Sequence, residues 1–420
     1  MIKSITGTKD ILPQEIPLWK RLESIVHQMF RNFNYKEIRT PIFEETALFA
    51  RGIGEDTDIV SKEMYTFIDR SKTSLTLKPE MTASVVRAFI EHSLDKHQPL
   101  NKFYYISPMF RQERPQAGRQ RQFHQFGGEA LGSSSPLLDA EIIEIAYCIL
   151  SELGLKDLNV KINSLGVPES RQKYKSILKE YLFDFKNSLS EDSRRRFDTN
   201  ILRIFDSKIE SDQALLKNAP LLIDYLDNES KEHFEIVKNI LSQSNIPFEI
   251  DPKLVRGLDY YTKTTFEILS AKVGSQSALC GGGRYDLLVK QLGGEPTPGV
   301  GFAAGMERIL LACANENSII LPDEKVDLYI VNLDKVVLHY KVYKLASTFR
   351  HKNLIVDFDY LNRSVKAQMR EANKLKARFV MFVGGDEYKS GKITLKNMET
   401  GEQKLIEIDN FSLIADIIKK

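Results

Sequence analysis

Arginine, glutamate and glutamine side chains gather in one short stretch of the chain, residues 103–132. This stretch predicts two strands, 102–111 and 121–131, joined by a basic loop. Because side chains alternate between the faces of a strand, one face of the second strand combines charge, ring and amide. The side chains on that face are Arg121, Phe123, Gln125, Gly127 and Glu129. Guanidinium groups bind phosphates and carboxylates through directed hydrogen bonds, so this face suits an anionic ligand.

Glycines and arginines around this hairpin strengthen the expectation of a ligand. Gly127 and Gly128 weaken a strand unless something must approach its backbone closely. Arg111 and Glu113 share one face of the first strand, and the turn at 115–118 suits a mobile loop over a polyanionic substrate. An ordinary polar hairpin at the surface is the alternative, because exposed arginines are common in proteins.

Two further polar clusters stand where predicted elements begin. The segment LKPEMTASVVR places Glu80 and Thr82 at the start of a helix, and either side chain could simply cap it. The segment RGLDYYTKTTFEI places Arg256, Tyr260 and Tyr261 at the entrance of a strand, where paired tyrosines often only pack. Each cluster fits either a binding site or a structural role.

Two glycine-rich segments complete the candidate contacts. GGGRYD, which contains Tyr285, permits close approach of a ligand to the backbone, although three glycines also make a flexible turn. GVGFAAGMERI alternates like a buried strand and enters a helix that carries Arg308, for which a surface ion pair is the alternative. Because four such clusters occur in one predicted domain, we expect them to form a common site.

Hydrophobic periodicity predicts strands that alternate with helices. Apolar residues at helical spacing predict helices over 16–33, 79–90, 137–153 and 306–314. The strands between them do not repeat strictly, which favours a mixed α/β sheet over a doubly wound one. Residues 168–248 are highly charged and helical in period, and they predict a helical insertion within a large first domain, 1–325.

The C-terminal region, residues 326–420, is predicted to form a compact α/β unit after a linker at 315–325. Its predicted strands are 327–333, 353–360 and 378–385, and they alternate with helices at 335–350 and 363–376. From Lys325 to Lys420 the chain holds 18 Lys and Arg against 12 Asp and Glu, a net charge of +6, whereas the whole chain carries +2. This asymmetry favours a polyanionic partner such as nucleic acid. The alternative is that the excess lysines only keep the surface of this region hydrated.

Length and composition indicate a multidomain soluble protein. A chain of 420 residues corresponds to two to four domains at about 100 to 200 residues each. The three cysteines are widely spaced and form no CxxC pair, which indicates a reducing compartment and no zinc site. The sequence shows no signal-peptide core and no uncharged run of membrane-spanning length, so we expect a cytoplasmic protein that does not enter a membrane.

Together the motifs carry a resemblance to a known family. GIGEDTDIVSKEMYTF, LKPEMTASVVR, MFRQERPQAGRQRQFHQFGGE, RGLDYYT, CGGGRYD and GVGFAAGMERI appear in the order found in histidyl-tRNA synthetases, a class II aminoacyl-tRNA synthetase family. FRQERP and GFAAGMER resemble class II enzymes in general, whereas RGLDYYT is specific to the histidine enzymes. The resemblance spans nearly the whole chain. It implies an antiparallel-sheet catalytic domain, a helical insertion that touches the acceptor arm, and an α/β anticodon-binding domain.

The resemblance implies activation of L-histidine by ATP and transfer of the histidyl group to the 3′ end of tRNA(His). Arg111 and Arg256 match family arginines on opposite sides of the α-phosphate, and they are the expected catalytic residues. Glu113 matches the contact with the adenine amino group, and Arg121 and Arg308 match contacts with the ATP tail or base. Mg²⁺ is expected on the outer phosphates without a dedicated protein site, because it keeps waters and binds substrate oxygens.

For the amino acid, the resemblance implies two groups of contacts. Glu80, Thr82 and Gln125 are expected around the α-amino and carboxylate groups, and Glu129, Tyr260 and Tyr261 near the imidazole, with Tyr285 as a further contact. The amino-acid loop departs from the typical family sequence Arg-Pro-Glu-Gly-Thr, because this chain has Lys78 and Met81 there. Lysine lacks the planar fork of arginine, and methionine is bulkier than glycine.

The resemblance also implies a homodimer, whose interface is built by the helix and strand that end at Pro41. Two alternatives share the fold. One is a regulatory paralogue of histidine biosynthesis, which lacks the anticodon domain and the arginine-bearing histidine loop. The other is a tRNA-sensing, synthetase-like binding module without aminoacylation activity. This chain has both features that the paralogue lacks, and retention of Arg111, Arg256 and Arg308 argues against the binding module.

Overall fold

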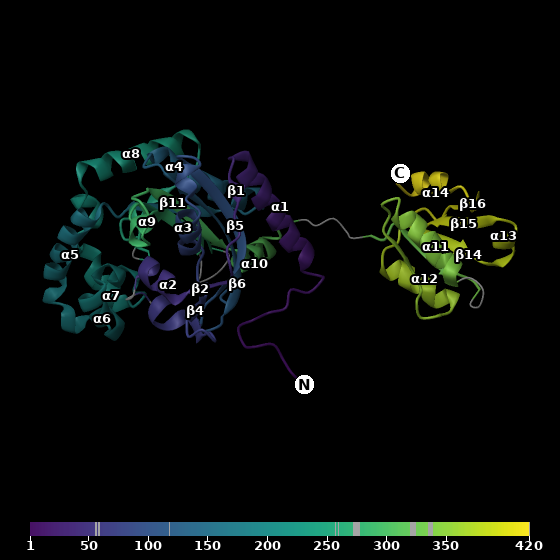
Figure 1. Cartoon of the computed structure of the whole chain (residues 1–420), viewed down its shortest axis with the longest axis horizontal. Coiled ribbons are helices and arrows are strands. Elements are labelled where there is room, and N and C mark those ends of the chain that lie inside the picture. Colours follow the sequence, from purple (N-terminus) through teal and green to yellow (C-terminus); the bar gives the residue numbers. More distant parts are fainter. Residues whose placement is uncertain are drawn as a thin grey trace. The chain divides into compact units, whose positions relative to one another are not determined.

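The computed structural model describes residues 1–54, 57, 59–116, 118–256, 258, 260–271, 278–319, 325–334 and 339–419. The chain forms two compact units, Met1–Ile320 and Leu321–Lys420 (Figure 1). Residues of the sequence motifs that lie outside the described residues are Glu55, Asp56, Asp58, Ala117, Gly257 and Asp259. The same holds for linker residues 320–324 and for residues 335–338 at the start of the predicted helix 335–350.

A large sheet carries the first unit. Among the described residues it has eight strands in the order β1-β5-β6-β11-β10-β9-β7-β8. The strands are β1 (Lys36–Glu37), β5 (Asn101–Phe110), β6 (Gln122–Leu131), β7 (Leu158–Ser164), β8 (Glu249–Ile250), β9 (Thr262–Ser270), β10 (Ala278–Arg284) and β11 (Gly299–Gly305). The six central strands pair antiparallel, and the two edge pairs, β1 with β5 and β7 with β8, are parallel. This confirms the predicted mixed α/β fold with an antiparallel catalytic sheet.

Helices bury the hydrophobic face of this sheet. They are α1 (Ile16–Asn32), α4 (Pro136–Glu152) and α10 (Met306–Glu316). On α1, apolar residues at helical spacing face inward, and Phe30 stacks on Tyr104 with ring centroids 4.8 Å apart. Helix α4 begins at Pro136 because the Ser135 hydroxyl accepts a hydrogen bond from the Leu137 N–H. On the opposite face, Tyr105, Met109 and Leu131 belong to a second hydrophobic cluster together with Val85, Val86 and Phe89, so only part of that face is left for a ligand.

A small sheet leads into the amino-acid loop. Strands β2 (Phe43–Glu45), β4 (Ser74–Leu77) and β3 (Tyr65–Ile68) form it, and α2 (Thr46–Ile53) and α3 (Thr82–Glu91) follow β2 and β4. Residues 78–81 connect β4 directly to α3, so the helix begins later than the predicted residue 79. Lys78 donates its N–H to Ile42 O, and its own carbonyl accepts from the Phe110 N–H, which ties this loop to the large sheet.

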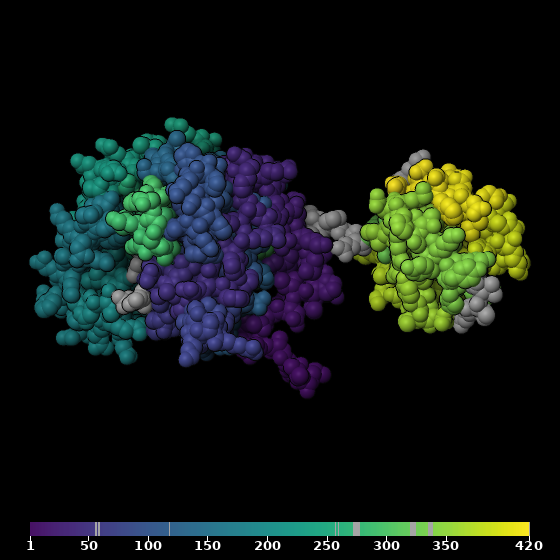
Figure 2. All heavy atoms as spheres, in the orientation of Figure 1, coloured from purple at the N-terminus to yellow at the C-terminus, as the bar shows by residue number. Residues whose placement is uncertain are grey.

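Residues between β7 and β8 form mostly helices: α5 (Pro168–Phe183), α6 (Glu191–Thr199), α7 (Glu210–Leu215) and α8 (Asn228–Gln243). Asp212 is buried at their centre and accepts hydrogen bonds from the hydroxyls of Ser190, Ser193 and Ser207, each at 2.6 Å. In Figure 2 the teal atoms of this region adjoin the purple atoms of the N-terminal segments, and both belong to the first unit.

The second unit is built on a sheet in the order β13-β12-β14-β15-β16 among its described residues. The strands are β12 (Leu328–Asn332), β13 (Val356–Phe358), β14 (Phe379–Val383), β15 (Lys392–Asn397) and β16 (Gln403–Glu407). Its helices are α11 (His339–Arg350), α12 (Val365–Lys374), α13 (Gly385–Lys389) and α14 (Phe411–Lys419). The first three strands correspond to predicted strands, whereas the hairpin of β15 and β16 was not predicted. No helix in the described ranges is long and apolar enough to span a bilayer.

Candidate active site

A pocket of about 210 Å³ lies over β6, β9, β10 and β11, beside the start of α3. It brings together side chains that are far apart in the sequence. Of the predicted site residues, its wall contains Glu80, Thr82, Arg111, Glu113, Gln125, Arg256, Tyr260, Tyr261 and Arg308. Arg121, Glu129 and Tyr285 are not among the lining residues. The four clusters therefore form one site.

Four arginines line this pocket: Arg111, Arg119, Arg256 and Arg308. Arg111 is held by its Nε, which donates to Pro79 O at 2.9 Å, and its guanidinium carbon lies 5.3 Å from the ring centroid of Phe123. Arg308 donates to Gly118 O and to Ala278 O at 3.0 and 3.1 Å. Burial and the nearby Arg119 lower the pKa of Arg308. An anion bound between these guanidinium groups would stabilise their charged forms.

Arg256 lies against the tyrosines and pairs with Glu267. Its guanidinium carbon is 5.6 Å from the ring centroid of Tyr261. Burial alone would lower the pKa of Arg256, but Glu267 together with Tyr261 and Tyr260 outweighs burial and raises it. Arg256 therefore stays cationic in a water-poor setting, where its charge acts strongly on a ligand.

Glu80 caps α3 and also faces the pocket. Its Oε2 accepts from the Thr82 N–H at 2.7 Å and its Oε1 from the Ala83 N–H at 2.9 Å. Burial raises the pKa of Glu80, opposed by these two hydrogen bonds. The capping role considered from the sequence is thus present, and it fixes Glu80 at the pocket wall rather than excluding it from a site.

Glu129 lies directly behind the wall and is fully buried. Its Oε1 accepts from the Thr82 hydroxyl at 2.7 Å, and its Oε2 accepts from the Tyr285 hydroxyl at 2.5 Å. Burial raises the pKa of Glu129 to about 8, against the lowering effect of both hydroxyls. A Cβ on Gly301 would lie 1.8 Å from Glu129 Oε2, so that glycine makes room for the carboxyl group. The predicted contact of Glu129 with a ligand stays a prediction.

The two adjacent tyrosines of RGLDYYT both line the pocket. Their rings are tilted with centroids 4.7 Å apart, and Tyr260 also contacts Tyr285 edge-on at 5.8 Å. Burial raises the pKa of Tyr260, so its hydroxyl keeps its proton and remains a hydrogen-bond donor. Tyr285 does not line the pocket itself, but it contacts Glu129 and the lining residue Tyr260.

Arg121 lies against the N-terminal segment. Its Nη1 donates to Thr6 O at 3.3 Å, and its Nε donates to Glu113 O at 3.5 Å. Its backbone N–H donates to Gly7 O at 2.6 Å. The structure therefore uses Arg121 to fix the N-terminal segment, and its contact with ATP remains a prediction.

The glycines of β6 serve packing, so the interpretation of Gly127 and Gly128 as marks of a ligand was wrong. A Cβ on Gly127 would lie 2.4 Å from the Tyr105 hydroxyl, and one on Gly128 would lie 2.6 Å from the Phe30 ring. The Gly127 Cβ would lie even closer, at 2.2 Å, to the backbone oxygen of Phe302, so all these neighbours belong to the protein itself. In GGGRYD, by contrast, a Cβ on Gly281 would lie 2.6 Å from Arg256 Nη1, so this glycine admits a side chain of the site.

Two charged residues that line the pocket, Glu267 and Glu307, were not predicted, and Arg119 was predicted only as a residue beside the basic loop. Glu267 stands between the buried Phe266 and Ile268 on β9, and such a carboxylate in an apolar strand is a signal for a site. Arg119 pairs with Glu113 at 3.2 Å. Glu307 accepts hydrogen bonds from the backbone N–H of His124 on β6, and this contact can be recognised only from the fold.

Both residues that depart from the family sequence contact Thr40. The Lys78 Nζ lies 3.4 Å from Thr40 Oγ1, and that hydroxyl lies 3.5 Å from the sulfur of Met81. Lys78 is fully buried, and burial lowers its pKa to about 8, with Glu44 acting in the opposite direction. Lys78 and Met81, which replace the arginine and glycine of the typical family sequence, thus both contact the Thr40 hydroxyl.

Comparison with known proteins agrees with this geometry. The family model described as histidyl-tRNA synthetase matches residues 7–309, and that described as anticodon binding domain matches residues 327–415. The Histidine--tRNA ligase of Caldanaerobacter subterraneus is 47% identical over 97% of this chain and 98% of its own length. That of Listeria innocua is 48% identical over 95% of each chain. The crystal structure of apo S. aureus histidyl-tRNA synthetase superposes with a TM-score of 0.83 at 40% identity and covers all of both chains. The chain belongs to the histidyl-tRNA synthetase family.

Proposed function

We propose that this enzyme activates L-histidine with ATP and transfers the histidyl group to tRNA(His). The observation that carries the proposal is the single pocket in which Arg111, Arg256 and Arg308 meet Glu80 and the two tyrosines. Guanidiniums suit the phosphates of ATP, and the carboxyl and phenol groups suit an amino acid with a polar ring.

In the first step, a carboxylate oxygen of histidine forms a bond to the α-phosphorus as the bond to pyrophosphate breaks. Arg111 and Arg256 are the residues proposed to neutralise the negative charge that grows on the phosphoryl oxygens. Comparable electrostatic donors contribute about 10²- to 10³-fold in rate. In the second step, a terminal ribose hydroxyl of the tRNA forms an ester with the histidyl carbonyl carbon, and AMP leaves. Neither step needs a nucleophilic side chain.

Histidine is proposed to bind in the part of the pocket that Gln125, Tyr260 and Tyr261 line. The Gln125 Oε1 atom is buried and has no hydrogen-bond partner within the described residues, so it suits the α-ammonium group of a ligand. A neutral imidazole offers one donor and one acceptor, which the phenols of Tyr260 and Tyr261 and the Glu129 carboxyl are proposed to satisfy. Apolar analogues would leave these groups unpaired and bind poorly.

ATP is proposed to place its adenine near Glu113 and its phosphates near the arginines. In the described residues no cluster of three His, Cys, Asp or Glu could hold a metal ion. Apart from Glu113, which is assigned to the adenine, the pocket wall contains the carboxylate of Glu267. This supply fits Mg²⁺, which takes one or two carboxylates and otherwise binds substrate phosphates and water. When bound, Mg²⁺ would neutralise charge on the outer phosphates, and the contact of Arg121 and Arg308 with the ATP tail is proposed beside it.

The partners follow from the family and from charge. We propose that the basic C-terminal unit binds the anticodon arm and that residues 168–248 touch the acceptor arm of tRNA(His). The α1–β1 region that ends at Pro41 is proposed as a homodimer interface. The three cysteines are free, which fits the proposed cytoplasmic location. Light scattering at micromolar concentration tests the dimer, because a monomeric mass would contradict it.

Exchange of labelled pyrophosphate into ATP tests the function. The enzyme is expected to catalyse exchange only with L-histidine present, and then to charge tRNA(His). A regulatory paralogue or a tRNA-sensing module would show no exchange. Arg256→Ala should lower the exchange rate constant by about 10²-fold or more and raise the KM for ATP much less. Equal loss in both parameters would contradict the transition-state role of Arg256.

A further inference from the structure

Tyr261 is held from outside the pocket by the helical insertion. Arg171, one turn into α5, donates from its Nη1 to the Tyr261 carbonyl oxygen at 2.7 Å. A charged donor on a backbone carbonyl fixes the main chain, whatever side chain that residue carries. The pocket tyrosine therefore takes its position partly from a helix that lies outside the catalytic sheet.

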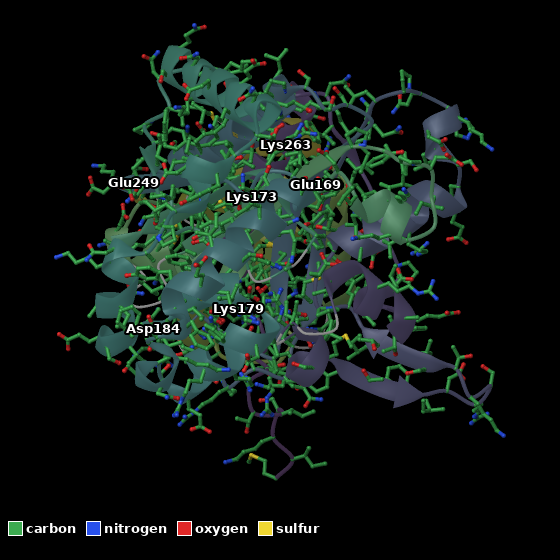
Figure 3. All side chains as sticks on the ribbon, turned by 90° about the vertical axis from the view of Figure 1, so that its left-hand side faces the viewer. Glu169, Lys173, Lys179, Asp184, Glu249 and Lys263 are labelled. Carbon is green, nitrogen blue, oxygen red and sulfur yellow. The ribbon has the colours of Figure 1, made fainter. Side chains whose placement is uncertain are left out.

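A second contact joins the same segment to the other end of the insertion. Lys263 follows Tyr261 by two residues, and its Nζ lies 2.6 Å from Glu229 Oε1 in the first turn of α8. Lys263 is buried, while Glu229 is exposed. Figure 3 labels Lys263 together with Glu169 and Lys173 of α5, which faces the viewer.

The backbone at Lys263 is strained in a way that favours a functional role. Its φ of 44° lies in the left-handed region that non-glycine residues seldom adopt. The surrounding contacts hold it there: its N–H donates to Gly166 O at 2.9 Å, and its carbonyl accepts from the Leu165 N–H at 2.7 Å. Gly166 also has a positive φ, 61°, immediately before α5. The start of the insertion and the tyrosine segment therefore form one connected unit.

We propose that Arg171 and the Glu229–Lys263 pair are positioning residues through which the helical insertion sets the affinity of the pocket for histidine. Tyr261 lies beside Arg256 and lines the pocket, so a shift of α5 changes both the phenol and its neighbouring guanidinium. The inference rests on the proposed function. Because coupling between two ligands is reciprocal, tRNA bound to the insertion would change histidine affinity by the same factor by which histidine changes tRNA affinity.

The test is histidine-dependent pyrophosphate exchange without tRNA, with wild type, Arg171→Ala and Arg171→Lys. Arg171→Ala should raise the KM for histidine about tenfold and leave the KM for ATP within about twofold, because a charge-assisted hydrogen bond is lost. Arg171→Lys keeps a donor and should recover part of the affinity. Lys173→Ala is the matched control, since Lys173 is an exposed cation on the same helix.

Glu229→Ala provides a second variant that removes an exposed side chain and should fold normally. It should raise the histidine KM by about two- to threefold. A histidine KM that is unchanged in both Arg171→Ala and Glu229→Ala overturns the proposal, and so does an equal rise of the histidine and ATP constants. Wild-type enzyme without any exchange would instead contradict the proposed function. As a last readout, histidine should change the Kd for tRNA(His) in wild type, and this effect should shrink in Arg171→Ala.

Discussion

Gly281 and Arg256 share one small space at the edge of the pocket. A Cβ on Gly281 would lie 2.6 Å from Arg256 Nη1, so the guanidinium rests against the glycine backbone. Gly281 is the cross-strand partner of Glu267, and the Glu267 carboxylate also pairs with Arg256. The backbone of β10 and the carboxylate of β9 therefore aim one guanidinium at the site.

Gly281→Ala should act like loss of Arg256. The added methyl group displaces the guanidinium, and the exchange rate constant should fall about tenfold or more. Because both changes remove the same interaction, Gly281→Ala in an Arg256→Ala background should cost little further. Gly52→Ala is the control, because its Cβ would lie 3.4 Å from its nearest neighbour. If Gly281→Ala lowers the rate equally with and without Arg256, the shared space is irrelevant to turnover.

Glu129 gives the first pH prediction. Burial raises its pKa from 4.5 to about 8, so the folded state holds the proton more tightly than the unfolded chain. The stability contributed by this group is complete below about pH 4.5 and is lost as pH rises through 8. Glutamine cannot ionise, so Glu129→Gln should not lose this stability. The difference in urea midpoint, Glu129→Gln minus wild type, should therefore increase between pH 5 and about 8.5.

Urea unfolding of the two proteins at both pH values measures this gain. Glu232→Gln on the exposed face of α8 is the control and should show no such trend. A constant difference between Glu129→Gln and wild type would mean that Glu129 is ionised at all these pH values.

Much of the site was predictable because its residues stand in local motifs. The segments that carry Glu80, Arg111, Arg256, Tyr261 and Arg308 predicted lining side chains, and the structure places all five in one pocket. A charged residue between apolar residues of a strand is also visible in the local sequence. Glu267 is such a residue, although it was not predicted.

Cross-strand neighbours and contacts between distant segments were not predictable. Gly127 is the partner of Tyr105 in the β5–β6 register and lies against the Phe302 carbonyl of β11, and these cross-strand neighbours explain the glycine. Arg171 lies 90 residues from Tyr261, and nothing in either segment points to the other. The hairpin of β15 and β16 was not predicted because most of its side chains are exposed or half-buried, so the alternation of apolar and polar residues is weak.

Lys78 gives the second pH prediction. Burial lowers its pKa from 10.5 to about 8, so the folded state pays for holding an ammonium at neutral pH. That cost is complete below about pH 8 and is relieved as pH rises to 10.5. Lys78→Met should therefore stabilise the protein by about 1 to 3 kcal/mol at pH 7. The gain should shrink at higher pH.

Chemical unfolding at pH 7 and pH 9.5 compares Lys78→Met with wild type. Lys290→Met, at an exposed position, serves as the control for a lost surface charge. A loss of stability in Lys78→Met at pH 7 would show that the contacts of Lys78 with Thr40 outweigh the cost of burying its charge.

Aromatic side chains on the second unit predict where unpaired tRNA bases bind. The rings of Phe358 and Tyr360 lie 4.2 Å apart, and the Arg350 guanidinium carbon lies 5.7 Å from the Phe358 centroid. Tyr360 is 63% exposed, and Tyr343, 58% exposed, contacts Phe358 edge-on. Exposed rings beside a cation are the usual platform for stacked bases.

Tyr360→Ala should raise the KM for tRNA(His) in aminoacylation by about tenfold, because one stacking contact contributes about 1 to 3 kcal/mol. Pyrophosphate exchange needs no tRNA, so its rate and the histidine KM should stay at wild-type values. Leu405→Ala removes another exposed hydrophobic side chain from the same unit and should change neither assay. Tyr360→Phe keeps the ring and should retain wild-type affinity for tRNA. If Tyr360→Ala charges tRNA(His) normally, the bases must bind elsewhere on this unit.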